Sequence, residues 1–306
     1  MIYTVTFNPA IDYIAEINSI NEEKINRAIS EKVLAGGKGI NVSVVLHNLC
    51  IKSVVLGFIA GFTGNEIKRQ VENHGINTDF VYLDNKFSRI NVKLVSKTAG
   101  VVLRETAING EGPKIMEKDV EEFMRKIDKL KEGDILVLAG SISRKMKDDI
   151  YEKICMRVKE KNVKIVADAT GTLLVNVLKH KPFLIKPNKE ELEEIFQDEI
   201  NSNEEIIMYA KKLQEMGAEN VLISLGGDGA VLLTKDKNVL YSKAPKGTVV
   251  NSVGAGDSMV AGFLAGLLTY DDYEKAFKMG IAAGSASTFS ENLATKEEIL
   301  DQFSKI

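Results

Sequence analysis

The chain has 306 residues, of which 44% are hydrophobic and 27% are charged, with only five prolines. This composition is typical of a globular protein with a sizeable core, so it excludes intrinsic disorder and collagen-like repeats. Forty Lys and Arg against 43 Asp and Glu give a net charge of −3. No overall positive field therefore attracts nucleic acid or an anionic membrane, and any anionic ligand must be held by local charges.

Two cysteines, Cys50 and Cys155, form no close pair in the sequence, which favours free thiols in a reducing compartment. The first residues alternate like a strand and lack a basic segment followed by an apolar one, so we expect no secretory signal. The most apolar stretch, residues 253–268, is short for a membrane span and contains Asp257. We therefore expect a cytoplasmic protein that does not enter a membrane.

Short β-rich runs alternate with helical patterns along most of the chain. Strands are predicted at residues 3–7, 53–58, 134–138, 163–167, 183–185 and 221–224. Helices are predicted at residues 39–49, 117–130, 145–159, 204–216 and 272–287, where apolar residues recur at three-to-four spacing. The alternation predicts an α/β fold in three layers, a mostly parallel sheet with helices on both faces.

Two segments, residues 12–34 and 88–108, break this alternation. In the second, Ile90, Val92 and Leu94 alternate with polar residues, and a turn at residues 98–100 follows. We expect both segments to form antiparallel strands outside the main sheet, as a discontinuous lid. No linker divides the chain, so we expect one domain over residues 1–306 whose lid could also pair with a second copy in a homodimer.

The strongest local motif is the run from Asn251 to Leu267, NSVGAGDSMVAGFLAGL. Gly254, Ala255 and Gly256 stand where a loop enters an apolar helix, so their backbone N–H groups can form an anion hole. Asp257 follows in the first turn. It is either a stabilising first-turn carboxylate or a general base that takes a proton from a hydroxyl attacking a phosphoryl group.

Three further loops carry polar residues. Gly36-Gly37-Lys38-Gly39 precedes Asn41 and is either a substrate loop or a flexible turn. The run 224–229, SLGGDG, follows a strand at the edge where α/β proteins bind ligands. The run 186–191, KPNKEE, has the pattern of a helix-capping box and could also reach Mg²⁺ through water. Neither a GxxxxGK[ST] loop nor a dinucleotide fingerprint is present, and the three histidines lack metal-ligand spacing.

The order of these motifs resembles the ribokinase-like (PfkB) sugar kinases. The motifs are NPAID, AGGKGIN, GFIAGFTG, RINVKL, TAINGEGP, DATG, KPNKEEL, SLGGDGA and NSVGAGDSMVAGF, and they cover nearly the whole chain. Within the family, NPAIDY, GGKGINVS and RINVKL are most similar to the branch that phosphorylates the 6-hydroxyl of fructose 1-phosphate, with the tagatose-6-phosphate kinases next. The resemblance implies a ribokinase-like fold with a small β-sheet lid, and ATP and Mg²⁺ as partners.

The resemblance also implies roles for individual residues. It makes Asp257 the general base, with the anion hole at Gly254, Ala255 and Gly256. It assigns the sugar and its phosphate to Asp12, Gly37, Lys38, Asn41 and Arg89, with Arg27 and Lys93 as further helpers. It assigns ATP to Lys186, Asn188, Ser224, Gly226, Gly229 and Gly284, and Mg²⁺ to Glu191 and Asn188 through water.

The sequence departs from the family pattern at two places. Ala107 stands where relatives commonly have Glu, which removes a carboxylate from the lid. The turn from Gly140 to Arg144 lacks the usual proline. The alternatives to a fructose-1-phosphate kinase are a kinase of tagatose 6-phosphate or another ketose phosphate and, more remotely, a noncatalytic protein that binds sugar or nucleotide.

Overall fold

The fold was examined in a computed structural model that describes residues 1–21, 23–84, 86–98, 101–142 and 146–306. Its central feature is a nine-stranded sheet in the order β13-β12-β11-β10-β9-β8-β1-β4-β5. In chain order its strands are β1 (Ile2–Thr6), β4 (Ser53–Ala60), β5 (Asn77–Leu83), β8 (Ile135–Ala139), β9 (Lys164–Asp168), β10 (Leu184–Ile185), β11 (Asn220–Ser224), β12 (Ala230–Leu233) and β13 (Val239–Ser242). All neighbours pair in parallel except β11–β12 and β12–β13 at one edge.

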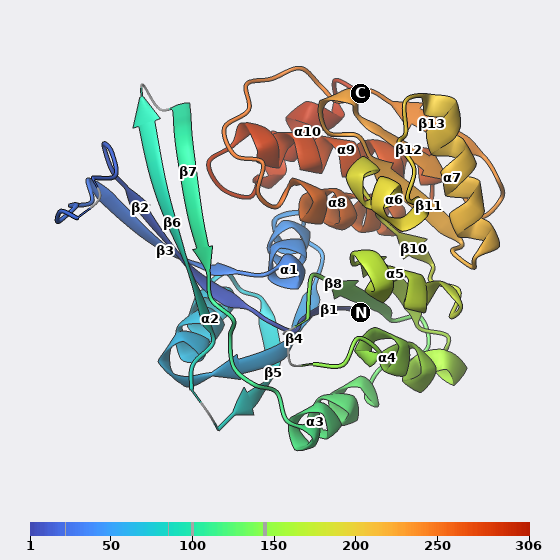
Figure 1. Ribbon diagram of the computed structural model, residues 1–306. Helices are drawn as coiled ribbons and strands as arrows, with labels where there is room; N and C mark the ends of the chain where they lie inside the picture. The colour runs from blue at the N-terminus through green and yellow to red at the C-terminus, as the bar shows by residue number, and fades with distance from the viewer. Residues whose placement is uncertain (22, 85, 99–100, 143–145) are drawn as a thin grey trace.

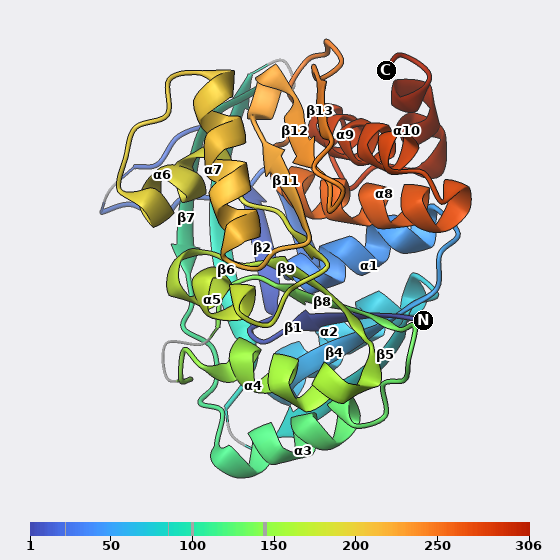
Figure 2. The ribbon, with the colours of Figure 1, turned by 90° about the vertical axis from the view of Figure 1, so that its right-hand side faces the viewer.

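Helices cover both faces of this sheet, which confirms the three-layer prediction (Figures 1 and 2). One face carries α1 (Lys38–Asn48), α2 (Gly61–Asn73), α8 (Ala255–Tyr270), α9 (Tyr273–Phe289) and α10 (Lys296–Phe303). The other carries α3 (Glu117–Ile127), α4 (Ile150–Val158), α5 (Gly171–Leu178), α6 (Lys189–Phe196) and α7 (Asn203–Glu215). Two single 3₁₀ turns lie at Lys159–Lys161 and Gly226–Asp228.

The strands read as apolar runs because side chains on both of their faces are buried. Leu136 and Leu138 of β8 pack on the α3–α4–α5 side, whereas Ile135 and Val137 pack against the layer that contains α1 and α8. Burial on both faces is what makes alternation disappear in such strands. No helix in the described part of the chain is long and apolar enough to cross a membrane.

A separate four-stranded sheet projects from one side of the body (Figure 1). Its order is β3-β2-β6-β7, with β2 (Ala10–Glu16), β3 (Ser30–Gly36), β6 (Arg89–Thr98) and β7 (Val101–Asn109). The two predicted insertions therefore do form one sheet outside the large one. We call it the small sheet.

The expectation that all strands of the small sheet run antiparallel was wrong for one pair. β2 and β6 pair in parallel, whereas β2–β3 and β6–β7 are antiparallel hairpins. The physical reason is that β2 follows β1 and β6 follows β5, two strands of the large sheet that run in the same direction and end at the same edge. β2 and β6 therefore leave this edge in the same direction. Residues 99 and 100 of the expected turn lie outside the described residues.

Two predicted helices differ from the observed ones at an end. α4 starts at Ile150 rather than near 145, because a turn precedes it in which the Ile150 N–H donates to the Lys147 carbonyl at 3.3 Å. α3 ends at Ile127, and the Leu130 N–H then donates to the Ile127 carbonyl in a tight turn. The last residues of the Gly140–Arg144 turn lie outside the described residues.

Candidate active site

The start of α8 has the geometry of an anion-binding helix end. Gly254 caps the helix in the left-handed region, at φ 82°. A Cβ on this residue would lie 2.7 Å from Leu293 Cδ2, so both conformation and space require glycine. The Ala255 N–H donates to the Ser252 carbonyl at 3.3 Å, a long bond that a phosphate oxygen could replace. The first N–H groups of a helix have no intrahelical acceptor, so this helix start suits the nest predicted at Gly254–Gly256, and its binding of an anion stays a prediction.

Asp257 is buried in the first turn of α8, with 5% of its surface exposed. Asn41 of α1 donates its Nδ2 hydrogen to Asp257 Oδ2 at 2.8 Å. Burial raises the pKa of Asp257 to about 6, and the charge of Asp168 adds to this effect. A carboxylate with a pKa near 6 is mostly ionised at neutral pH, yet it is basic enough to accept a proton from a hydroxyl group.

Asp168 is a site residue that the sequence analysis missed. It ends β9 at the carboxyl edge of the sheet and is 1% exposed. Lys38 Nζ lies 3.2 Å from Asp168 Oδ1, and Lys186 Nζ lies 3.3 Å from the same oxygen. Burial alone would raise the pKa of Asp168, but the two ammonium groups hold it below its ordinary value. The signals in the sequence were its place just after a predicted strand and its position as the first residue of the DATG motif.

The two lysines reach Asp168 from different elements. Lys38 is the first residue of α1, and Lys186 follows β10. Burial alone would lower the pKa of Lys38, but nearby carboxylates, Asp168 foremost, raise it. A Cβ on Gly256 would lie 3.1 Å from Lys186 Nζ, so this ammonium group lies against the first turn of α8. Both ammonium groups thus meet at Asp168 near the start of α8, and the predicted contact of Lys38 with the substrate's phosphate stays a prediction.

Asn188 and Glu191 form the capping box that their spacing predicts. The Glu191 N–H donates to Asn188 Oδ1 at 2.7 Å, and the Asn188 N–H donates to Glu191 Oε2 at 2.9 Å, at the start of α6. Glu191 also contributes to the raised pKa of Lys38, so its charge faces the site. In the described residues no cluster of His, Cys, Asp and Glu is spaced to hold a metal ion by itself. A role in Mg²⁺ binding for this pair stays a prediction.

A second polar group lies on the inner face of the small sheet. Asp12 accepts hydrogen bonds from Asn91 Nδ2 at 2.7 Å and from Lys93 Nζ at 3.0 Å. Burial lowers the pKa of Arg89, and the charge of Asp12 opposes this effect. Asn91 is another residue that the sequence analysis missed, and its Oδ1 has no hydrogen-bond partner among the described residues. This group offers a carboxylate and two cations to a polar ligand.

A cavity of about 610 Å³ separates the small sheet from the body. Asp12, Gly36 and Lys93 line one side of it, and Asn41 and the segment 249–253 line the other. Because Asn41 also holds Asp257, the cavity connects the polar group on the small sheet with the start of α8. Gly37, at φ 143°, is the N-cap of α1 between these two groups, and a Cβ there would lie 2.5 Å from Thr6 Cγ2.

The predicted nucleotide residues lie in neighbouring loops. Asn188 and Ser224 form a parallel β-bridge, so the segments 186–191 and 224–229 lie side by side. Gly226, at φ 56°, has open space around it, whereas a Cβ on Gly229 would lie 2.0 Å from the Ser242 carbonyl oxygen. Gly284 lets α9 approach α8, since a Cβ there would lie 3.1 Å from the Ala255 carbonyl oxygen. Contact of these residues with ATP stays a prediction.

Arg27 does not join the other predicted residues. It is exposed on the loop between β2 and β3, which lies at the outer end of the small sheet and far from α8 (Figure 1). Its predicted contact with substrate therefore has no support within one copy of the chain.

The sequence and fold were compared with known proteins. The family model described as "pfkB family carbohydrate kinase" matches residues 5–300. A 1-phosphofructokinase of Bacillus subtilis is 46% identical over 97% of this chain and 95% of its own. A D-tagatose-1-phosphate kinase of Bacillus licheniformis is 37% identical over 99% of this chain and 97% of its own. A crystal structure from Staphylococcus aureus, described as a phosphofructokinase, has a TM-score of 0.88 and 41% identity over 99% of this chain and 97% of that one.

Proposed function

We propose that this chain, which belongs to the pfkB family of carbohydrate kinases, transfers the terminal phosphoryl group of ATP to the 6-hydroxyl of fructose 1-phosphate. The product is fructose 1,6-bisphosphate. The observation that carries the proposal is the buried Asp257 beside the glycine nest, which Asn41 links to a cavity whose other side holds Asp12 and Lys93. A base, an anion hole and a polar sugar site are the parts that this transfer requires.

In this mechanism Asp257 accepts the proton of the 6-hydroxyl while that oxygen attacks the phosphorus atom in line. Asn41 fixes the orientation of the carboxylate through its 2.8 Å hydrogen bond. The nest at Gly254–Gly256, together with Lys38 and Lys186, stabilises the charge that spreads over the phosphoryl oxygens. No covalent intermediate with the protein forms, because the hydroxyl attacks directly.

Asp12 and its neighbours would hold the sugar. Asp12 and Asn91 have the acceptor and donor atoms that sugar hydroxyls need, and they are already oriented by the 2.7 Å bond between them. Arg89 and Lys93 supply positive charge near Asp12 for the phosphate already on the substrate. Lys38 is less suited to that phosphate than Arg89, since its ammonium group is held by Asp168.

The nucleotide would lie along the loops at residues 186–191 and 224–229, with Gly284 behind them. Mg²⁺ fits the oxygen donors of Asn188 and Glu191, which face the site but already bond each other, so water would join them to the ion. When bound, Mg²⁺ neutralises charge on the phosphates of ATP. The free thiols of Cys50 and Cys155 and the need for ATP support a cytoplasmic location.

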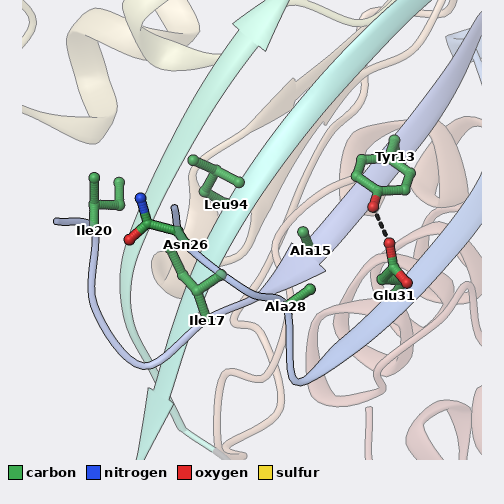
Figure 3. A pocket seen from close by; sticks show the side chains of 8 residues that line it. All are labelled: Tyr13, Ala15, Ile17, Ile20, Asn26, Ala28, Glu31 and Leu94. Atoms are coloured by element: carbon green, nitrogen blue, oxygen red, sulfur yellow. Dashed lines mark hydrogen bonds between the residues drawn. The ribbon is translucent and has the colours of Figure 1, made fainter. Parts of the chain in front are cut away.

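The small sheet would serve as a lid and as the interface of a homodimer. Its outer face carries Tyr13, Ala15, Ile17 and Leu94 around a cavity of about 280 Å³ (Figure 3). In the register of the sheet, Val33 and Ile108 lie on the same face as Tyr13, and they are 46% and 64% exposed. Exposed apolar side chains on a sheet are a hazard unless another surface covers them, and the same face of a second copy would do so.

A second candidate substrate is tagatose 1-phosphate, which differs from fructose 1-phosphate only in configuration at C4. The 37% identity to a D-tagatose-1-phosphate kinase favours it over sugars without a phosphate at C1. A coupled ATP-consumption assay should compare fructose 1-phosphate, tagatose 1-phosphate, fructose 6-phosphate and tagatose 6-phosphate by kcat/KM. We expect fructose 1-phosphate to lead. A clear lead for a 6-phosphate would overturn the assignment, and no turnover with any of them would indicate a noncatalytic binding protein.

A further inference from the structure

Asp168 lies where three parts of the chain converge, and none of the roles proposed above uses it. It ends β9, while its two ion-pair partners come from the start of α1 and from the loop after β10. Lys186 is 4% exposed and Asp168 is 1% exposed, so this ion pair is shielded from water. Burying a carboxylate without a counter-charge raises the free energy of the folded state, and burying an ammonium group alone does the same. Asp168 and Lys186 therefore depend on each other for their ionised states, whereas Lys38, whose side chain is 37% exposed, adds a second positive charge from the solvent side.

The cluster carries one negative and two positive charges, so it is positive overall. Lys186 Nζ lies close to Gly256, the last residue of the backbone nest, in the first turn of α8. Lys38 is three residues before Asn41, which holds Asp257. The surplus positive charge thus lies near the first turn of α8 and its Asp257, where a phosphoryl group in transfer would concentrate negative charge.

We infer that Asp168 is a positioning residue, which holds the Lys38 and Lys186 ammonium groups together at the start of α8 for the phosphoryl group in transfer. This inference rests on the proposed kinase function and gives a role to Asp168, the first residue of the DATG motif, to which the sequence analysis assigned none. Asp168 does not touch the substrate in this account. It acts through the two lysines, because both bond its Oδ1, at 3.2 and 3.3 Å.

The same arrangement links Asp168 to the ionisation of Asp257. The charged groups that act on Asp257 are Asp168 at the end of β9, Lys38 of α1 and Lys186 after β10, and Asn41 bonds it directly. Asp168 opposes ionisation of Asp257, and the two lysines favour it. Loss of the Asp168 charge would leave the lysines to act alone, so Asp257 would release its proton at a lower pH.

The test is the pH profile of kcat/KM for Asp168→Asn, measured with whichever ketose phosphate the wild-type enzyme prefers. We expect kcat/KM to fall roughly 10²–10³-fold, the usual loss when a stabilising group is misplaced. We also expect the acid limb of the profile to move to lower pH by about one unit or more. Because the assay uses the preferred substrate, failure of the fructose-1-phosphate assignment would leave this test intact.

A matched control is Asp134→Asn at the opposite end of the neighbouring strand β8. Asp134 is also buried, at 8% exposed, and pairs with the N-terminal ammonium group at 3.0 Å. We expect it to lower the unfolding temperature and to leave the shape of the pH profile unchanged. If Asp168→Asn and Asp134→Asn lose activity equally, and the acid limb of the pH profile moves in neither variant, Asp168 has only a structural role and the inference is overturned.

Two further variants extend the test, and the first of them does not require Asp168→Asn to fold. Lys186→Met removes a cation, so it should move the acid limb in the opposite direction, to higher pH. Lys38→Met in the Asp168→Asn background should cost much less than it costs alone, because the lysine has already lost its anchor. Independent, multiplicative losses, or an unmoved limb in Lys186→Met, would contradict the inference.

Discussion

Replacing Asp257 by Asn should inactivate the enzyme and at the same time make it more stable at neutral pH. Asparagine has nearly the same shape as aspartate, and its side-chain oxygen can still accept the hydrogen bond from Asn41 Nδ2. In the wild type this bond to Asp257 Oδ2 is 2.8 Å long. It cannot accept a proton from the sugar hydroxyl. We expect kcat to fall roughly 10²–10⁴-fold, the usual loss when a general base is removed.

The gain in stability follows from the pKa of Asp257, which burial raises from 3.8 to about 6. Between these two values the folded protein keeps a proton that the unfolded chain releases. The free energy of unfolding therefore falls as pH rises through this window, and the loss is complete above the folded-state pKa. A shift of two pKa units corresponds to about 3 kcal/mol. The free energy of unfolding of Asp257→Asn should therefore exceed that of the wild type by up to about this amount at pH 8 and by almost nothing at pH 4.

Urea unfolding of both proteins at pH 4, 6 and 8 measures this gain, and the coupled kinase assay measures the loss of turnover. Asp134→Asn serves as the control, because it removes an ion pair of the N-terminal ammonium group and should lower stability at pH 8. Turnover near the wild-type rate in Asp257→Asn would refute its role as the base. If the difference in free energy of unfolding between the two proteins is the same at all three pH values, the claim that burial raises the pKa of Asp257 is refuted.

Three other predictions follow from the geometry. Arg89→Ala should raise KM for fructose 1-phosphate tenfold or more with a smaller change in kcat, since a phosphate contact in the ground state is lost; steady-state kinetics check it, and an unchanged KM would place the phosphate elsewhere. Gly254→Ala should cost about 1–2 kcal/mol for its left-handed φ of 82° and about 1–3 kcal/mol more for the contact with Leu293. Gly133→Ala, at φ 81° with open space, should show only the first loss in urea unfolding, and equal losses would contradict the packing argument. The double variant Val33→Glu/Ile108→Glu should convert a dimer to a monomer in light scattering, because it places charges on the outer face of the small sheet, and a wild-type monomer would contradict the interface.

The parts that the sequence predicted well are those coded by neighbouring residues. The capping box of Asn188 and Glu191 spans four residues, and both of its hydrogen bonds are present. The nest before Asp257 is likewise local, since glycines at a loop-to-helix junction define it. The apolar strands followed from composition, because strands covered on both faces need apolar residues throughout.

The parts that the sequence did not predict depend on contacts between distant segments. Lys38 and Asp168 are 130 residues apart in the sequence. Only the strand order of the large sheet, which places the end of β9 near the start of α1, brings Lys38 Nζ within 3.2 Å of Asp168 Oδ1. The parallel pairing of β2 with β6 also escaped prediction, because alternation identifies a strand but not the direction of its neighbour.

Arg27 illustrates a different limit. A motif resemblance places a residue near a substrate without saying from which copy of the chain it comes. Here the residue lies on the outer loop of the small sheet, away from α8 (Figure 1).

The measurement that tests the central claim most directly is identification of the product by phosphorus NMR. Enzyme, ATP and fructose 1-phosphate are incubated, and the sugar product is compared with authentic fructose 1,6-bisphosphate. The account predicts one ADP for each new phosphate ester, located on C6, and a signal that grows at least roughly 100-fold more slowly with Asp257→Asn. No fructose 1,6-bisphosphate from fructose 1-phosphate, while parallel reactions with fructose 6-phosphate or tagatose 6-phosphate do form a bisphosphate, would contradict it.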